Sequence, residues 1–186
     1  MNASRYSKSD VLAAAMRLLD EVGLPDLTMR KLAATLDVQP SALYWHYANK
    51  QSLLAEVSNT IVGFAKPVSS GTTWQETAKL EALALRDALL AFRDGAEVVS
   101  STLALGLGAD HALERLETAI AIDDRELAHA TAESILFLVL GQVWHEQQRM
   151  QANSLGVVDN LELTGTPNLE IGIQLILQGL SERVKA

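Results

Sequence analysis

Hydrophobic residues recur three and four positions apart along almost the whole chain, and no alternating run indicates a strand. The first such segment follows Ser7, a typical N-cap residue with Asp10 three positions later, and it stops at Gly23. Thr28 can cap the next segment. The pattern predicts an all-α protein of about nine to ten helices. After two short helices between residues 28 and 47, the expected helices cover residues 49–65, 74–93, 96–101, 110–122, 124–152 and 167–184.

The stretch from residue 39 to residue 50 is unusual because most of its aromatic and imidazole rings fall outside the side that a protein core can cover. Pro40 suits the first position of a helix, where its missing N–H is not needed. Only Leu43 and Tyr47 fall on a side that a core can cover. The remaining side chains stay available for a binding partner: Ser41, Ala42, Tyr44, Trp45 and His46. We interpret this surface as one that contacts DNA.

The spacing around this stretch is that of a helix-turn-helix, in which a first helix supports a second one in the major groove. Asp37 lies at the corner, where a residue that tolerates left-handed φ is needed, and Ala33 is small where the two helices touch. The apolar positions around the corner are Leu32, Leu36, Val38 and Leu43. A plain two-helix hairpin would share these positions but would not explain the exposed aromatic rings.

Charge divides the chain into two parts. Its 186 residues have a net charge of −8. Residues 1–50 hold six Lys and Arg against five Asp and Glu, a balance of +1, which leaves nine against eighteen, or −9, for residues 51–186. Only the first part can approach phosphates without strong repulsion. We predict a helix-turn-helix domain over residues 1–48 and a larger helical domain over residues 49–186, connected by the helix at 49–65.

The two helices expected near the carboxyl end have much apolar surface. The segment from Ile135 to Trp144 is apolar on nearly every side, so we expect the helix at 124–152 to be buried all round. Gly172 and Gly179 lie on one face of the helix at 167–184, where another backbone could approach. These two helices suit a symmetric four-helix dimer interface. Closing an intramolecular core is the alternative.

No segment indicates export or a membrane. The chain has no cysteine, and its first residues lack the apolar core of a signal peptide. The longest apolar run, residues 135–140, is far shorter than the roughly 20 residues of a membrane span. We therefore expect a cytoplasmic protein that has no contact with a membrane.

Two motifs resemble the amino-terminal domain of the TetR family of transcriptional repressors. They are Leu-Thr-Met-Arg-Lys-Leu-Ala at residues 27–33 and Leu-Tyr-Trp-His-Tyr-Ala-Asn-Lys at residues 43–50. Weaker similarity to the tetracycline repressors extends over residues 74–76, 93–96 and 172–185. The resemblance implies a homodimer whose recognition helices enter successive major grooves of a palindromic operator in double-stranded DNA. It also implies a small-molecule effector that binds the second domain, moves the helix at 49–65 and releases the DNA.

The resemblance also implies which residues touch DNA. Phosphate contacts fall on Thr28, Tyr44 and Lys50, and contacts at or near base edges fall on Arg30, Trp45 and His46. Residues at the amino end of the recognition helix complete the set: Gln39, Pro40, Ser41 and Ala42. Lys50 would stand in the first turn of the helix at 49–65, where a cation opposes the helix dipole, and this exception favours a functional role. A solvated lysine is the alternative.

The effector pocket of the tetracycline repressors is changed in this chain. The positions that hold a drug–magnesium chelate there correspond to Lys66, Glu81, Leu85 and Val99, and Thr102 alone is retained. Val99 offers no donor to magnesium, so we expect no metal, no cofactor and no response to tetracycline. A partly apolar effector could present a polar or cationic group to Glu81. Further candidates for the pocket lining are Phe137, Trp144 and His145, for which dimer packing is the alternative.

Two other function classes compete with this interpretation. A metal-dependent helical-bundle enzyme would need more than Glu126 and His129, whose spacing occurs once where di-iron bundles need two copies. His145 and Glu146 lack the second histidine of a zinc-protease helix. A helical protein–protein interaction module could use the exposed rings for another partner. We expect a DNA-binding protein that is not an enzyme.

Overall fold

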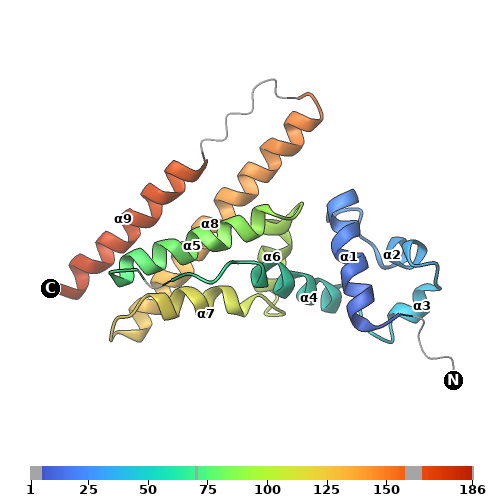
Figure 1. Cartoon of the computed structure of the whole chain (residues 1–186), viewed down its shortest axis with the longest axis horizontal. Helices are drawn as coiled ribbons and strands as arrows, with labels where there is room; N and C mark the ends of the chain where they lie inside the picture. Colours follow the sequence, from blue (N-terminus) through green and yellow to red (C-terminus); the bar gives the residue numbers. More distant parts are fainter. Residues whose placement is uncertain (1–5, 70, 158–164, 186) are drawn as a thin grey trace.

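The computed structural model describes residues 6–69, 71–157 and 165–185. Within these ranges the chain forms helices and no strand, which confirms the predicted all-α class (Figure 1). Helices α1 to α3 lie together at one end of the molecule, and α5 to α9 form the larger bundle. The helices are α1 (Lys8–Val22), α2 (Met29–Thr35), α3 (Pro40–Leu43), α4 (Lys50–Gly63), α5 (Trp74–Leu90), α6 (Gly95–Ala104), α7 (Asp110–Ala119), α8 (Arg125–Ser154) and α9 (Gly165–Lys185).

The caps predicted for the first two helices are present. Ser7 and Asp10 make a capping box at the start of α1, and Gly23 ends this helix with a φ of 80°. The Thr28 side chain accepts a hydrogen bond from the backbone N–H of Lys31 at 3.1 Å and so caps α2. Asp37 has a φ of 53°, as the sharp corner requires.

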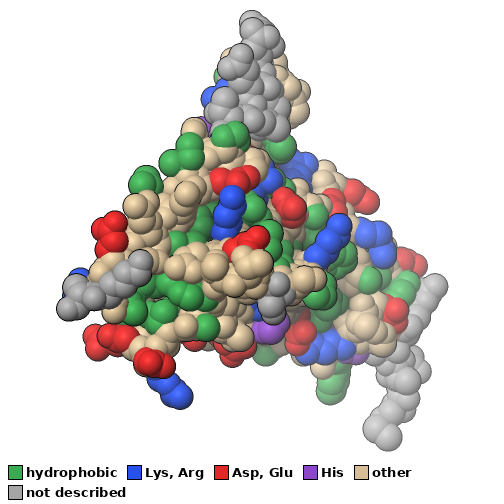
Figure 2. All heavy atoms as spheres, turned by 60° about the vertical axis from the view of Figure 1, so that its left-hand side comes forward, with side chains coloured by type: hydrophobic (Ala, Val, Ile, Leu, Met, Phe, Trp, Pro, Cys, Tyr) green, Lys and Arg blue, Asp and Glu red, His purple; other side chains and the backbone are tan. Residues whose placement is uncertain are grey.

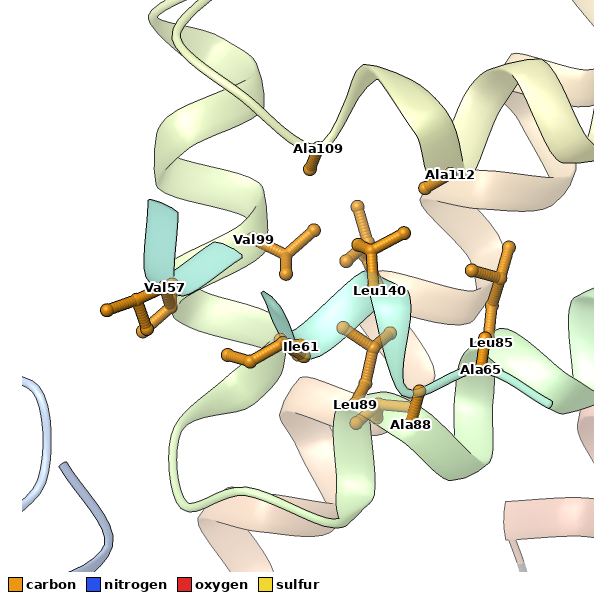
Figure 3. Close-up of a cluster of buried hydrophobic side chains, with 14 of the residues drawn as sticks. Val57, Ile61, Ala65, Leu85, Ala88, Leu89, Val99, Ala109, Ala112 and Leu140 are labelled. Atoms are coloured by element: carbon orange, nitrogen blue, oxygen red, sulfur yellow. The ribbon is translucent and has the colours of Figure 1, made fainter. Parts of the chain in front are cut away.

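Helix α4 is packed in both parts of the molecule. Asn49 caps it through a capping box, and Leu53 and Leu54 are buried near its start. Val57 and Ile61 of the same helix belong to the cluster of buried side chains in Figure 3, together with Val99 of α6 and Leu89 of α5. The buried side chains of both parts belong to one hydrophobic cluster. Any rotation of α4 therefore changes the packing of both parts.

One packing prediction is wrong for the single chain, and a second large ring lies open beside it. Phe64 is exposed after the end of α4, where its ring meets the Phe92 ring edge-on with centroids 5.0 Å apart. Helix α8 is not buried all round, because Phe137 is 58% and Trp144 47% exposed. By length and composition α8 could cross a membrane, with a mean hydropathy of 1.3 over its most apolar window. One side of α8, however, is buried against α5, α6, α7 and α9, as in the core helix of a bundle.

The turn between α5 and α6 differs from the sequence expectation and joins the two parts. Helix α5 ends at Leu90 instead of residue 93, and Asp94 then adopts a left-handed φ of 55°. The buried Asp94 carboxylate accepts hydrogen bonds from the Leu24 N–H and from Gln151 Nε2 of α8, both at 2.8 Å. A side chain at Gly23 would begin 2.8 Å from the Asp94 Oδ2 atom. This turn thus connects the end of α1 to α8.

We predict that Asp94→Ala lowers the free energy of unfolding by about 1–3 kcal/mol, because one buried and one half-buried donor lose their acceptor. Asp94→Asn is the matched control: its amide oxygen still accepts, its amide group can pair with a reoriented Gln151, and asparagine tolerates left-handed φ. Urea denaturation of both variants measures the difference. An equal loss in the two variants would show that the hydrogen bonds do not matter at this turn.

Candidate DNA interface and effector region

Residues 40–47, which we call the recognition segment, form one turn of α-helix followed by further turns. Helix α3 ends at Leu43, whose carbonyl accepts hydrogen bonds from the N–H groups of His46 and Tyr47, both at 3.0 Å. This geometry presents two neighbouring rings to solvent, with Trp45 87% and Tyr44 51% exposed. Leu43 and Tyr47 are buried, as predicted. The segment therefore has a fixed inner side and an aromatic outer side.

The other predicted DNA contacts differ in their exposure. Gln39 and Ser41 are exposed, whereas Pro40, Ala42 and His46 are half-buried. His46 is thus less open to solvent than Tyr44 and Trp45. It follows Trp45 in the turn, and its backbone N–H is used within the segment.

Residues outside α3 add candidates for phosphate contacts. Thr28 and Arg30 are exposed at the start of α2. Lys50 is half-buried in the first turn of α4, and its Nζ lies 3.4 Å from the carbonyl oxygen of Leu24. This weak contact gives the lysine a local partner at the end of α1 and holds it beside the recognition segment.

Tyr47 fixes the inner side of the segment to α1. Its hydroxyl donates to the carbonyl oxygen of Lys8 at 3.3 Å, and the Lys8 ammonium lies 5.2 Å from the ring centroid while it pairs with Glu56 of α4. Burial and, secondly, the negative charge of Glu56 raise the pKa of Tyr47 to about 12. Tyr47 thus connects α1, the recognition segment and α4.

The eight residues predicted for the effector pocket do not form one site. Leu85 and Val99 are buried in the interior cluster of Figure 3. Thr102 is also buried and donates to the Ser58 hydroxyl of α4 at 2.8 Å. These three side chains lie in the core of the bundle, in the part of it that packs on α4.

The other predicted pocket residues lie outside this interior. Phe137 and Trp144 line a groove of about 500 Å³ between α6 and α8, whereas His145 is exposed and Lys66 is exposed after α4. Glu81 lies nearer the interior, but its carboxylate is paired with Arg115 of α7, with Nη2 and Oε2 2.5 Å apart. Arg115 thus already neutralises Glu81, which the sequence leaves open to a polar or cationic group of the effector. Spacing on one helix could not reveal this partner.

The described ranges contain no group of three or more side chains suited to hold a metal ion. His129, considered with Glu126 for a metal pair, instead contacts Glu117 of α7. Several of the ion pairs in these ranges join two helices, as Lys79 of α5 and Glu170 of α9 do.

Comparison with known proteins agrees with the geometry of the recognition segment. The sequence profile "Bacterial regulatory proteins, tetR family" matches residues 11–57, which cover α1 to the middle of α4. The chain is 33% identical to the class E tetracycline repressor protein of Escherichia coli, over 84% of this chain and 76% of that protein. The chain belongs to the TetR family. The similarity to the class G tetracycline repressor protein of Vibrio anguillarum spans only about half (49%) of that protein.

Solved structures extend the similarity over the whole TetR-family fold. The crystal structure of Mycobacterium smegmatis BioQ superposes with a TM-score of 0.86 and 39% identity, over 96% of this chain and 99% of that one. BioQ with its natural double-stranded DNA operator superposes with a TM-score of 0.79 and 38% identity, over 95% and 98% of the two chains. This chain therefore has the architecture of a regulator crystallised on its operator.

We predict that Tyr47→Phe costs about 0.5–1.5 kcal/mol of stability near neutral pH, because the hydrogen bond to the Lys8 carbonyl is lost. Because folding raises the Tyr47 pKa from 10.0 to about 12, the folded state holds this proton more tightly than the unfolded chain does. The corresponding stabilisation is complete below pH 10 and is lost as the pH rises toward 12.

The difference in stability between wild type and Tyr47→Phe should therefore shrink as the pH rises from 10 to 12, as measured by urea denaturation. Tyr44→Phe, at an exposed ring of the same segment, is the control and should match wild type throughout. A constant difference between wild type and Tyr47→Phe across this range would contradict the assignment.

Proposed function

We propose that this chain is a ligand-responsive transcriptional repressor that binds a palindromic operator in double-stranded DNA as a homodimer. The observation that supports this best is the recognition segment, in which Leu43 and Tyr47 are buried while Tyr44 and Trp45 project into solvent. A helix-turn-helix uses this arrangement to anchor one side and read DNA with the other. The matching profile and the operator complex of BioQ support the same function.

The second protomer is proposed to cover α8 and α9. Besides Phe137 and Trp144 of α8, Ile171 and Leu175 of α9 are exposed. Figure 2 shows hydrophobic side chains open to solvent among charges of both signs on the face carrying the left-hand helices of Figure 1. An added Cβ at Gly179 would meet nothing within 4 Å, whereas at Gly172 it would press on Leu138 of the same chain. Gly172 thus serves packing within the chain, while Gly179 remains available to the partner.

The effector is proposed to be a largely apolar small molecule that acts on the interior beside α4. The labelled side chains of Figure 3 are aliphatic, and several, including Ala88, Ala109 and Ala112, are small. Val99 cannot bind magnesium and Glu81 is already paired, so neither a metal chelate nor a cationic group has a binding partner at these two positions. The lack of a tetracycline response stays a prediction. We also propose that the protein acts in the cytoplasm and is not an enzyme.

We predict that selection from random DNA yields a palindromic sequence. Variants of the predicted DNA contacts, which form the reading surface, should then separate into two classes. Lys50→Ala should weaken binding to all sequences alike and reduce the slope of log affinity against log salt by about 1. Arg30→Ala or His46→Ala should relax sequence choice at single positions, by about 1–3 kcal/mol for a base contact. Fluorescence anisotropy in a salt series, with wild type and operator variants, measures both effects.

Lys66→Ala is the matched control. Lys66 is an exposed lysine that matches Lys50 in charge, but it lies beyond the opposite end of α4. It should leave both the affinity and the salt slope unchanged. Wild-type affinity that does not depend on salt would favour the protein–protein interaction alternative.

We predict that Trp144→Glu together with Leu175→Glu abolishes the dimer, because two charges per protomer would be buried in the interface. Analytical ultracentrifugation should show wild type as a dimer and the double variant as a monomer with an unchanged helical circular dichroism spectrum. Trp45→Glu, which charges an exposed ring outside the interface, should remain dimeric. Dimerisation of the double variant would place the interface elsewhere.

A further inference from the structure

A single arginine joins α7 to the far end of α4. Arg115 Nη1 donates to the Ala65 carbonyl oxygen and Nη2 to the Lys66 carbonyl oxygen, both at 2.9 Å. The same guanidinium donates to Glu81 Oε2 of α5 from Nε at 2.8 Å and from Nη2 at 2.5 Å. The two side chains are 13% and 15% exposed. Three helices thus meet at one guanidinium, which we call the Arg115 clamp, formed by Arg115, Glu81 and these two carbonyls.

The clamp places a cation just beyond the end of α4. The carboxyl end of a helix carries partial negative charge, which a cation stabilises, and Arg115 binds the carbonyls of the first two residues after the C-cap Phe64. Helix α4 has no basic residue in its last turn, so Arg115 provides the cation from another helix. A guanidinium is suited to this role because its planar donors can satisfy several acceptors at once, whereas an ammonium is a point charge. Glu81 neutralises the arginine, which would otherwise be a largely buried, unpaired charge.

The position of the clamp connects it to the interior cluster. Arg115 lies one turn beyond Ala112 on α7, and Glu81 one turn before Leu85 on α5. Ala112, Leu85 and Ala65 all belong to the buried cluster of Figure 3, so the clamp lies at the edge of the aliphatic interior. A molecule that separates α4 from α5 and α7 here must stretch or break the hydrogen bonds of the clamp.

We propose that Arg115 is a positioning residue for operator binding: through the clamp it holds the carboxyl end of α4 against α5 and α7, and so sets the orientation of the helix-turn-helix. This inference rests on the proposed function and deepens it by assigning the contact that transmits the state of the large bundle. The opposite end of α4 carries Lys50 beside the recognition segment. Because α4 is one helix, a change at its far end is passed to the reading surface.

The chain offers a matched control in a second buried ion pair. Arg86 of α5 and Glu146 of α8 are 14% and 3% exposed, with Nη2 and Oε2 3.0 Å apart. Among the described residues, the Arg86 guanidinium donates to Asp87 and Glu146 and makes no hydrogen bond to α4. Removing either arginine leaves a carboxylate without its main partner, so the two variants should lose comparable stability. Only the loss of Arg115 releases α4.

The test compares Arg115→Met with Arg86→Met by two measurements. Since the chain has no cysteine, Ala34→Cys and Ala121→Cys, both at exposed positions, allow two spin labels, one on α2 and one beside the large bundle. Labelled protein is mixed with excess unlabelled protein so that electron–electron double resonance reports the distance within one chain. Operator affinity is measured by anisotropy on the selected sequence without effector.

We expect Arg115→Met to shift or broaden the α2-to-bundle distance and to weaken operator binding at least about tenfold. Arg86→Met should keep both wild-type values despite its lower melting temperature. Glu81→Gln, which keeps an acceptor but removes the charge, should fall between wild type and Arg115→Met, and it covers the case in which Arg115→Met does not fold.

Equal effects of the two arginine variants would overturn the proposal, as would wild-type distance and affinity in both Arg115→Met and Glu81→Gln. If wild type binds no DNA sequence selectively, the proposed function fails. The distance measurement still decides in that case whether the clamp orients the amino-terminal helices.

Discussion

The structure depends on the shared packing of α4, which begins among the helices of the reading domain and ends inside the large bundle. Leu53 and Leu54 are buried near its start, and Val57 and Ile61 in its second half, within one continuous hydrophobic cluster. A helix that is buried at both ends cannot rotate without disturbing close-packed side chains on one side or the other. Operator reading and effector binding are therefore coupled through a rigid element and not through a flexible linker.

Polar contacts also attach α4 to the large bundle. The Ser58 hydroxyl receives the Thr102 hydrogen bond in the middle of α4, and Arg115 holds the carbonyls beyond its end. A second connection runs through Asp94, which joins the end of α1 to α8. The reading domain is thus attached at two places, at α4 and at the α5–α6 turn. Two attachments fix the orientation of the amino-terminal helices more firmly than α4 alone would.

The sequence predicted features that depend on local chemistry. The caps at Ser7 and Thr28, the left-handed corner at Asp37 and the buried pair Leu43 and Tyr47 follow from hydrogen-bonding capacity and periodicity. It did not predict contacts between helices far apart in the chain. Glu81 was interpreted as open to a ligand because its partner Arg115 lies 34 positions away. The exposure of Phe137 and Trp144 likewise depends on which helices cover α8, a tertiary property that apolar composition alone does not determine.

The most direct test is a crystal structure of the protein on its selected operator. We expect two protomers joined through α8 and α9, with Tyr44 and Trp45 at the DNA in successive major grooves. Thr102 should still donate to Ser58, and Arg115 to the carbonyls after α4. A complex in which another surface meets the DNA, or in which the DNA-bound chain has lost these contacts of α4, would contradict this expectation.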